Sequence, residues 1–189
     1  QITEGIHGLV PCGTTGESAT LTHDEHERVI EICIEQVAGR VPVLAGAGSH
    51  NTEEAIRLTR FARKAGADGA LLITPYYNKP TQEGLYRHFR AIAEAVDIPL
   101  VPYNVPGRTG CDLLPETVAQ LAQHPNIVGI KEAVSDPQRI AALAALRSDH
   151  FAVFSGDDGS AAQAMLAGFD GLISVASNAL PRAYRRLCD

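Results

Sequence analysis

The sequence predicts an α/β fold built on a parallel β-sheet, and two observations lead to this prediction. Short runs of aliphatic and β-branched residues recur seven times along the chain, and each run is continuous rather than alternating with polar residues. Continuous apolar runs are typical of parallel strands that are covered on both faces. Between these runs lie segments in which apolar residues recur at helical spacing. Strands and helices that alternate in this way form either an open doubly wound sheet or a closed (β/α)8 barrel.

The length of the chain favours the barrel in an incomplete form. A full (β/α)8 TIM barrel needs about 250 residues, whereas this chain has 189 residues. Seven strands with a ragged start fit a barrel that lacks its first strand and its C-terminal helices. No linker or shift in composition divides the chain, so we expect residues 1–189 to form a single partial barrel domain. The expected strands are residues 8–11, 41–46, 69–74, 98–103, 127–130, 151–154 and 171–175.

The first two helices between these strands carry start and stop signals. Thr22 is followed three residues later by Glu25, which is a capping box at a helix start, and Gly39 is the expected stop. A second helix is expected to open at Asn51 and to end at Gly66.

Later helices are marked by Thr81, which precedes a third helix, and by Pro115 and Pro137, which lie where a first helical turn tolerates proline. The third helix has an apolar stripe that predicts its buried face. The stripe consists of Leu85, Phe89, Ile92 and Val96.

Charge and composition exclude several classes of partner. The chain has 16 Lys and Arg against 22 Asp and Glu, a net charge of −6, and no run rich in Lys or Arg. These values argue against nucleic acid and against an anionic membrane as partners. No apolar stretch approaches the roughly 18 residues of a membrane-spanning helix, and the N-terminus does not resemble a signal peptide. We therefore expect a cytoplasmic protein, and reduced thiols because its 4 cysteines form no C-x-x-C pair.

One of the three lysines stands out by its position. Lys64 lies in the polar last turn of a helix and Lys79 in a proline-flanked loop, so both are expected to be solvated. Lys131 directly follows the expected strand 127–130, at the end of a parallel sheet where ligands bind. Two interpretations are open. Lys131 is either a packed strand-end lysine, neutralised by Glu132, or an amine nucleophile that forms a Schiff base with a carbonyl substrate.

A nucleophilic lysine needs a lowered pKa, which burial or a nearby cation supplies. Arg108 is the candidate cation. The same arginine offers a fork that recognises carboxylates, and Tyr103 at the end of the preceding strand can relay protons. The alternative for each residue alone is a Pro-Gly turn with a solvated arginine and a packed tyrosine.

The turn at residues 13–18 is expected at the same end of the sheet. Its glycines allow close backbone approach to an anion, and Thr14 and Thr15 add hydroxyl donors for a carboxylate or phosphate. The alternative is a plain turn between strand and helix. His23 and His26 lie three residues apart at a helix start but have no third ligand nearby, so a solvated turn is favoured over a metal site.

Five short motifs, in this order on successive expected strands, resemble those of one enzyme family. It is the family of 4-hydroxy-tetrahydrodipicolinate synthase (dihydrodipicolinate synthase), which belongs to the pyruvate-dependent class I aldolases together with N-acetylneuraminate lyase. The resemblance covers nearly the whole chain, and five motifs in register are specific although each alone is weak. They are residues 13–18 (GTTGES), 75–78 (PYYN), 103–109 (YNVPGRT), 129–132 (GIKE) and 155–158 (SGDD).

The resemblance implies a (β/α)8 barrel in which Lys131 attacks the keto carbon of pyruvate. The enamine then adds to the aldehyde of L-aspartate 4-semialdehyde, and the product cyclises to 4-hydroxy-tetrahydrodipicolinate in the diaminopimelate route to lysine. It implies neither an organic cofactor nor a metal. Tyr103 and Thr14 are the implied proton relay, completed by Tyr77 from the partner subunit of a dimer.

The resemblance also implies the substrate-binding residues. Thr15 joins Thr14 at the pyruvate carboxylate, Arg108 binds the carboxylate of the second substrate, and Gly156 and Ile173 belong to the same pocket. Sialic acid lyases and related sugar-acid aldolases usually lack an arginine at this position.

The resemblance also implies a homotetramer built of two dimers. Some family members are inhibited by lysine at the dimer interface. The corresponding positions here have His50 where an asparagine is usual. The implied lysine site consists of Ser18, Ala19, His26, His50, Glu54 and Tyr76.

Two alternatives remain open. One is another pyruvate-dependent Schiff-base lyase, which acts on N-acetylneuraminate or on a 2-keto-3-deoxy sugar acid. The other is a non-catalytic remnant domain, which the expected missing segments suggest.

Overall fold

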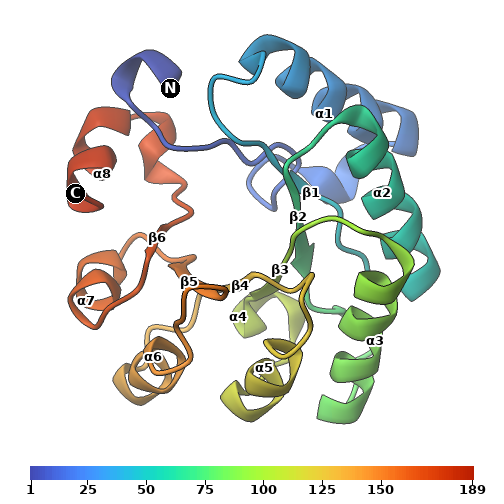
Figure 1. The fold of residues 1–189 in the computed structure, drawn as a ribbon, viewed down its shortest axis with the longest axis vertical. Helices are drawn as coiled ribbons and strands as arrows, with labels where there is room; N and C mark the ends of the chain where they lie inside the picture. Colours follow the sequence, from blue (N-terminus) through green and yellow to red (C-terminus); the bar gives the residue numbers. More distant parts are fainter.

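A curved, all-parallel β-sheet forms the centre of the molecule. The computed structural model describes residues 1–189. Its six strands lie in the sheet in the order in which they follow one another along the chain, and every neighbouring pair is parallel. In Figure 1 the sheet curls around the centre of the view, with the helices on its outer side. The strands are β1 (Leu44–Gly46), β2 (Gly69–Ile73), β3 (Leu100–Asn104), β4 (Gly129–Glu132), β5 (Ala152–Ser155) and β6 (Gly171–Leu172).

Each strand is followed by helical structure, so the predicted α/β class and the parallel sheet are confirmed. The α-helices are α1 (His23–Val37), α2 (Thr52–Ala65), α3 (Gln82–Ala95), α4 (Pro106–Thr109), α5 (Pro115–Leu121), α6 (Pro137–Ala144), α7 (Ala161–Leu166) and α8 (Pro181–Leu187). Three short 3-10 helices complete the set, namely η1 (Ile2–Glu4), η2 (Ser18–Thr20) and η3 (Ala176–Asn178).

The predicted helix starts are confirmed by their hydrogen bonds. The Thr22 hydroxyl accepts from the Glu25 amide and the Glu25 carboxylate accepts from the Thr22 amide, which completes the capping box of α1. The Asn51 side chain accepts from two amides of the first turn of α2, and Gly66, with a φ of 95°, caps the C-terminus of α2 as predicted. Helix α1 ends at Val37, two residues before the predicted Gly39, because Ala38 itself takes the left-handed conformation and caps the helix.

The later helix signals are also confirmed. The Thr81 side chain accepts from the amide of Gly84 at the start of α3, and Pro115 and Pro137 open α5 and α6. The apolar stripe of α3 is almost fully buried, and it comprises Leu85, Phe89, Ile92 and Val96.

Several strand predictions differ from the structure. Of the predicted strands 41–46 and 171–175, only Leu44–Gly46 and Gly171–Leu172 are formed. Residues 8–11 form only an isolated bridge between Leu9 and Val43. Pro11 has no N–H to donate and Cys12 has a positive φ of 55°, so the extended segment stops before a full strand forms. The fifth predicted strand is shifted, because β4 begins at Gly129 and runs through Lys131 and Glu132.

The two faces of the sheet carry different packing. Helices cover the outer face, where 25 buried residues form the main hydrophobic cluster around residues such as Leu72, Leu100 and Ile130. The other face carries a smaller cluster of four buried residues that includes Tyr103. Because side chains alternate between the faces of a strand, neighbouring residues of β3 and β4 belong to different environments.

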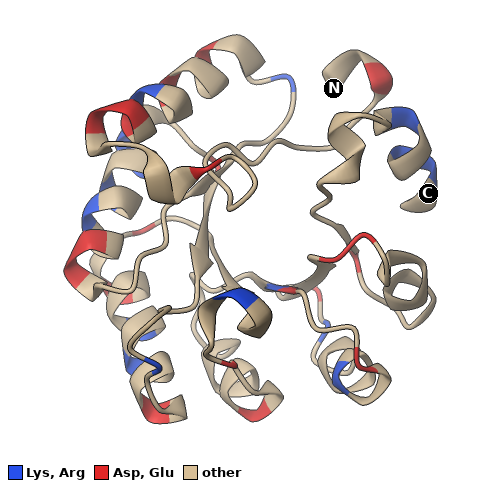
Figure 2. Cartoon of the chain, turned by 180° about the vertical axis from the view of Figure 1, so that it is seen from behind, with Lys and Arg blue, Asp and Glu red and all other residues tan.

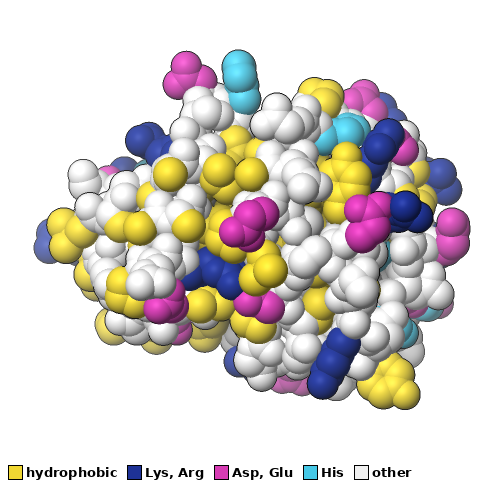
Figure 3. All heavy atoms as spheres, turned by 90° about the horizontal axis from the view of Figure 1, so that it is seen from below, with side chains coloured by type: hydrophobic (Ala, Val, Ile, Leu, Met, Phe, Trp, Pro, Cys, Tyr) yellow, Lys and Arg dark blue, Asp and Glu magenta, His cyan; other side chains and the backbone are white.

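The ends of the described chain meet on one side of the fold. Glu4 of η1 accepts from Arg182 of α8 at 2.7 Å, and Figure 1 shows the two termini near each other. Acidic and basic residues are interspersed over the outer helices, and the face in Figure 3 carries no extended patch of one charge (Figures 2 and 3). All four cysteines are free thiols. None of the helices combines the length and the apolar character that crossing a lipid bilayer requires.

His88 of α3 is a buried histidine at the contact between α2 and α3. Only 6% of the residue is exposed, and its Nδ1 atom lies 2.9 Å from the Thr52 hydroxyl. Its Nε2 atom is buried without a hydrogen-bond partner. Burial lowers the pKa of His88 from 6.5 to about 4, so the ring is neutral in the folded protein at neutral pH.

We expect His88 to make the fold less stable in acid. Because its pKa is lower in the folded than in the unfolded chain, this stabilisation is complete above about pH 6.5 and is lost as the pH falls toward 4. The loss from this residue is at most about 3 kcal/mol. Urea unfolding across this pH range measures it. The His88→Asn variant keeps a partner for Thr52 without a titrating ring, and an equally steep decline in that variant would contradict the assignment.

Candidate functional site

Lys131 lies inside β4 with its ammonium group beside an aromatic ring. The residue is 8% exposed, and β-sheet register places it directly opposite Tyr103 of β3. Its Nζ atom lies 4.0 Å from the centroid of the Tyr103 ring. The sequence interpretation placed Lys131 just after the strand, and this is corrected, because the lysine is an inner residue of β4. The pairing of Lys131 with Glu132, which belonged to one of the two open interpretations, is not formed, since the two side chains leave opposite faces of the strand.

The surroundings of Lys131 lower its proton affinity. Burial lowers the pKa of Lys131 from 10.5 to about 8, and the negative charge of Asp158 acts in the opposite direction. The sequence suggested burial or the Arg108 cation as the cause, and the structure assigns burial. A lysine with this pKa is neutral in about a tenth of the molecules at pH 7, which makes it a competent amine nucleophile.

Tyr103 links the predicted residues at this end of the sheet. Burial raises the pKa of Tyr103, whereas the positive charge of Arg108 and a hydrogen bond with the Thr14 side chain lower it. The structure therefore brings Tyr103 together with Lys131, Thr14 and Arg108. Arg108 and Thr14 are themselves exposed to solvent, so they are available to a ligand.

The segment that leads into the turn of Thr14 and Thr15 lies parallel to β1 at very short range. A Cβ atom on Gly46 would lie 2.0 Å from the carbonyl oxygen of Cys12, so only glycine fits at this position of β1. The Gly46 amide donates to the Pro11 carbonyl at 2.9 Å and anchors the segment from the other side. Close packing on Gly46 thus places the threonine turn at the carboxyl end of the sheet.

Gly156 and Ile173 follow β5 and β6 at the same end. A Cβ atom on Gly156 would lie 2.8 Å from Cε of Lys131, so the absent side chain leaves room for the lysine stem. Ile173 packs on the inner cluster with Tyr103, and its amide donates to the Ser155 carbonyl at 2.9 Å.

Asp158 is a residue to which the sequence interpretation gave no role. One carboxylate oxygen of Asp158 accepts from the amides of Val175 and Ala176, and the other is buried without a partner. Its negative charge acts to raise the pKa of Lys131. The signal in the sequence was its position two residues after Gly156, in a motif that ends a strand.

Tyr77 stands apart from the other predicted residues. It is 86% exposed and has a positive φ of 73°. Its backbone amide donates to the Thr109 carbonyl at 3.3 Å, which fixes the loop beside α4. Within this single chain Tyr77 therefore does not join Tyr103 and Thr14.

The residues of the implied lysine site divide into small groups. The His50 and Tyr76 rings are 4.8 Å apart, and Glu54 contacts Ser49 and the His23 ring. His26 is turned inward, with its Nε2 atom 2.7 Å from the Gly46 carbonyl. Ser18 and Ala19 belong to η2.

The prediction of a solvated turn is confirmed for His23 and wrong for His26. His23 is largely exposed, whereas His26 is 7% exposed. The two rings have different partners, Glu54 and Gly46. No group of three or more His, Cys, Asp or Glu side chains is arranged to hold a metal ion.

Lys131 lines neither of two cavities of the molecule. The larger, of about 690 Å³, is lined mainly by residues at and before the amino ends of the strands, such as Asp68 and Pro99, and it extends along the inner face as far as Ile173. Ligands of parallel α/β sheets bind at the carboxyl ends of the strands. We therefore interpret this cavity as space in the interior of the fold and not as a ligand site.

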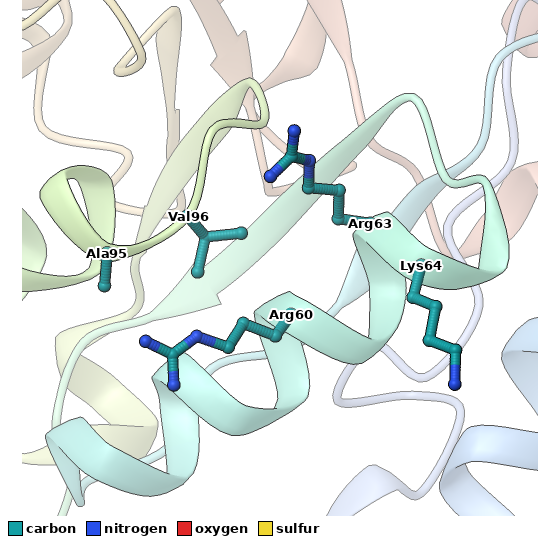
Figure 4. A pocket seen from close by; sticks show the side chains of 5 residues that line it. All are labelled: Arg60, Arg63, Lys64, Ala95 and Val96. Carbon is teal, nitrogen blue, oxygen red and sulfur yellow. The ribbon is translucent and has the colours of Figure 1, made fainter.

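The smaller cavity, of about 430 Å³, is lined by Arg60, Arg63, Lys64, Ala95 and Val96. Figure 4 shows that its three cationic side chains point in different directions. Arg63 is paired with Asp97 at 3.7 Å, and Lys64 is exposed as predicted. Divergent cations of this kind do not form an anion site.

A family model described as the dihydrodipicolinate synthetase family matches residues 1–189. The chain belongs to the dihydrodipicolinate synthetase family. It is 62% identical over 189 residues to a protein from Xanthomonas campestris pv. campestris named 4-hydroxy-tetrahydrodipicolinate synthase. That match covers 100% of this chain and 63% of the relative, so the chain spans less than two thirds of the relative's length.

Solved structures of the dihydrodipicolinate synthase family share the fold. A crystal structure of the chloride-inhibited enzyme from Acinetobacter baumannii, complexed with pyruvate, has a TM-score of 0.96 and 53% identity, and the match covers 99% of this chain and 64% of that one. The enzyme from Cyanidioschyzon merolae with lysine bound has a TM-score of 0.94 and 44% identity, with 97% and 63% covered. The resemblance inferred from five motifs is thereby confirmed at the level of the family.

We expect the size of residue 156 to control the burial of Lys131 in this dihydrodipicolinate synthetase family member. In Gly156→Ala the new methyl group displaces the lysine stem, so the ammonium gains water and its pKa rises from about 8 toward 10.5. The pH dependence of Lys131 labelling by an amine reagent, read by mass spectrometry, measures this shift. Gly159→Ala is the matched control, because a Cβ there would lie 3.4 Å from its nearest neighbour. Equal labelling midpoints in both variants would refute the steric argument.

Proposed function

We propose that this protein condenses pyruvate with L-aspartate 4-semialdehyde through a Schiff base on Lys131, which gives 4-hydroxy-tetrahydrodipicolinate in lysine biosynthesis. The observation that carries the proposal is the buried Lys131 amine, 4.0 Å from the Tyr103 ring centroid and with a pKa of about 8. The names of the relatives and the pyruvate bound to the Acinetobacter baumannii enzyme support the same substrate. The reaction makes the protein a lyase.

In the first half of the proposed reaction, the neutral Nζ of Lys131 attacks the keto carbon of pyruvate. The tetrahedral adduct loses its hydroxyl as water, so a proton must reach that oxygen. Tyr103 is adjacent to Lys131 and linked to Thr14, and we propose that these two residues deliver the proton. The hydroxyls of Thr14 and Thr15 hold the pyruvate carboxylate.

In the second half, loss of a methyl proton gives an enamine that bonds to the aldehyde carbon of L-aspartate 4-semialdehyde, and the former aldehyde oxygen takes up a proton to become the 4-hydroxyl group. The amino group of the same substrate then attacks the imine carbon, which closes the ring and breaks the bond to Nζ of Lys131, so the free lysine amine is restored. Arg108 is exposed and its charge reaches Tyr103, so it is suited to bind the carboxylate of this second substrate. Gly156 and Ile173 shape the pocket around the lysine. The chemistry needs no cofactor beyond the protein amine.

The finer architecture belongs to the same proposal. We propose that residues 1–189 are one domain, the larger part of a (β/α)8 barrel whose first strand and C-terminal helices lie outside these residues. The greater length of the relatives supports this. The active unit is a cytoplasmic homotetramer, built as a dimer of dimers, in which the exposed Tyr77 completes the proton relay of a partner subunit.

Inhibition by lysine is proposed at the surface near His50 and Tyr76. The lysine bound to the Cyanidioschyzon merolae relative supports it. The other residues of the proposed site are Ser18, Ala19, His26 and Glu54.

Reductive trapping tests the nucleophile. We expect borohydride with pyruvate to add a pyruvate-derived mass at Lys131 and not at Lys64 or Lys79. Because the folded-state pKa of Lys131 is about 8, the trapping rate rises as the pH increases toward 8 and then levels off. Peptide mass spectrometry locates the adduct, and Lys131→Arg is the control. An adduct at another lysine, or none, counts against the proposal.

Arg108 distinguishes this reaction from that of sugar-acid aldolases. We expect Arg108→Ala to leave pyruvate trapping within about twofold of the wild type and to reduce kcat/KM for L-aspartate 4-semialdehyde by about 100-fold, because a charge-assisted carboxylate contact is lost. Steady-state assays with L-aspartate 4-semialdehyde, N-acetylneuraminate and 2-keto-3-deoxygluconate make the comparison. Turnover of a sugar acid in preference to the semialdehyde would favour the alternative lyase.

A further inference from the structure

The outer face of the sheet carries a buried polar cluster directly behind Lys131. This strand-end network consists of Asn104 of β3, Glu132 of β4, Arg139 of α6 and Asp112, which precedes α5. The Glu132 side chain is 0% exposed and that of Arg139 is 12% exposed. A carboxylate at this depth is costly unless its oxygens are hydrogen-bonded, so the network must be nearly complete to be tolerated.

Both oxygens of Glu132 have donors. The Asn104 amide group lies 3.1 Å from each of them, the Val134 amide donates at 2.9 Å, and the Arg139 guanidinium donates at 3.3 Å. Burial raises the pKa of Glu132, and these hydrogen bonds together with the Arg139 charge oppose that rise. The donors therefore favour the ionised carboxylate, which accepts every bond offered to it.

The other half of the strand-end network holds a loop. Asp112 accepts from Asn104 at 2.8 Å and from Arg139 at 2.6 Å. The backbone of Leu113 donates to Asn104 and accepts from Arg139, both at 2.9 Å. The segment that follows α4 is thus held at the end of β3 and at α6 through the side chain of Asp112 and the backbone of Leu113.

The register of the sheet connects this network to the site. Asn104 pairs with Glu132 across β3 and β4, and Tyr103 pairs with Lys131 one step before. Each network residue is therefore the chain neighbour of a site residue on the opposite face. A backbone fixed at positions 104 and 132 leaves little freedom to the adjacent Cα atoms, which set the directions of Tyr103 and Lys131.

We propose that the strand-end network positions Lys131 against Tyr103 and holds the loop that follows Arg108, with Glu132 as its central positioning residue. The inference rests on the proposed function, because it takes Lys131 as the nucleophile. Glu132 acts through the backbone and touches no substrate. A displacement of about 1 Å in a reacting group can slow a reaction by about 100-fold, so a small relaxation of the strand ends is enough to be measured.

The test compares two carboxylate-to-amide variants at opposite ends of the sheet. Glu132→Gln keeps the size of the side chain but turns an NH2 group toward donors. Asp170→Asn is the matched control, because Asp170 also accepts from a strand amide, that of Val153 at 2.9 Å, and from an arginine, Arg147. Asp170 lies before β6, at the amino ends of the strands and away from Lys131.

We expect Glu132→Gln to slow pyruvate trapping at Lys131 by about tenfold or more at saturating pyruvate, and to change the half-saturating pyruvate concentration by less than about twofold. Asp170→Asn is expected to stay within about twofold of wild type in both values. Trapping is measured at a temperature well below the midpoint of thermal unfolding of each variant. A second readout does not need pyruvate, since the pH midpoint of Lys131 labelling by an amine reagent rises above about 8 in Glu132→Gln as the lysine gains water.

The outcomes separate this inference from the proposed function. A wild-type protein without a pyruvate adduct at Lys131 overturns the proposed function, whereas a wild-type adduct with unchanged trapping and labelling in Glu132→Gln overturns the positioning role alone. Equal losses in Glu132→Gln and Asp170→Asn also overturn it, because they indicate general loosening. If Glu132→Gln does not fold, Arg139→Lys keeps the charge but removes the fork, and the same slower trapping is required of it.

Discussion

The parallel pairing of β3 with β4 is the constraint on which the site depends. It places Tyr103 opposite Lys131 and Asn104 opposite Glu132, so one pair faces the inner cluster and the other faces the helices. A shift of one residue in this register would move each of these side chains to the opposite face of the sheet. The position of the lysine amine is therefore a property of the sheet, and the loops around it only complete its surroundings.

Burial acts in opposite directions on the two ionisable neighbours in β4. It lowers the pKa of Lys131 and raises that of Glu132, because in both cases a charged form loses contact with water. The surroundings that compensate for the lost water differ between the two faces of the sheet. Both oxygens of Glu132 accept hydrogen bonds, whereas Lys131 lies beside the Tyr103 ring and the charge of Asp158 opposes the lowering of its pKa. The hydrogen bonds at this end of the sheet therefore stabilise the Glu132 carboxylate, whereas burial dominates the pKa of the Lys131 amine.

Two glycines shape the same end of the sheet by leaving space. Gly46 admits the backbone of Cys12, and with it the threonine turn, while Gly156 admits the stem of Lys131. Any side chain at these positions would push apart elements that have to meet for the site to form. Close approach of backbone and side chain at these two points links the geometry of β1 and β5 to the lysine on β4.

The order of strands and helices follows from the sequence alone, because continuous apolar runs, the capping box at Thr22 and the prolines at 115 and 137 are local signals. The five motifs likewise led to the family. The exceptions are residues 8–11, where Pro11 and a positive φ at Cys12 interrupt the strand.

Only the tertiary structure decided that burial, not Arg108, lowers the pKa of Lys131, that His26 faces inward, and that Glu132 belongs to a network with Asn104 and Arg139. These features depend on strand register and on contacts between residues far apart in the chain. Electrostatic and hydrogen-bond energies are set by which groups the folded chain brings together and how much water it removes, and neither quantity is encoded in local sequence pattern.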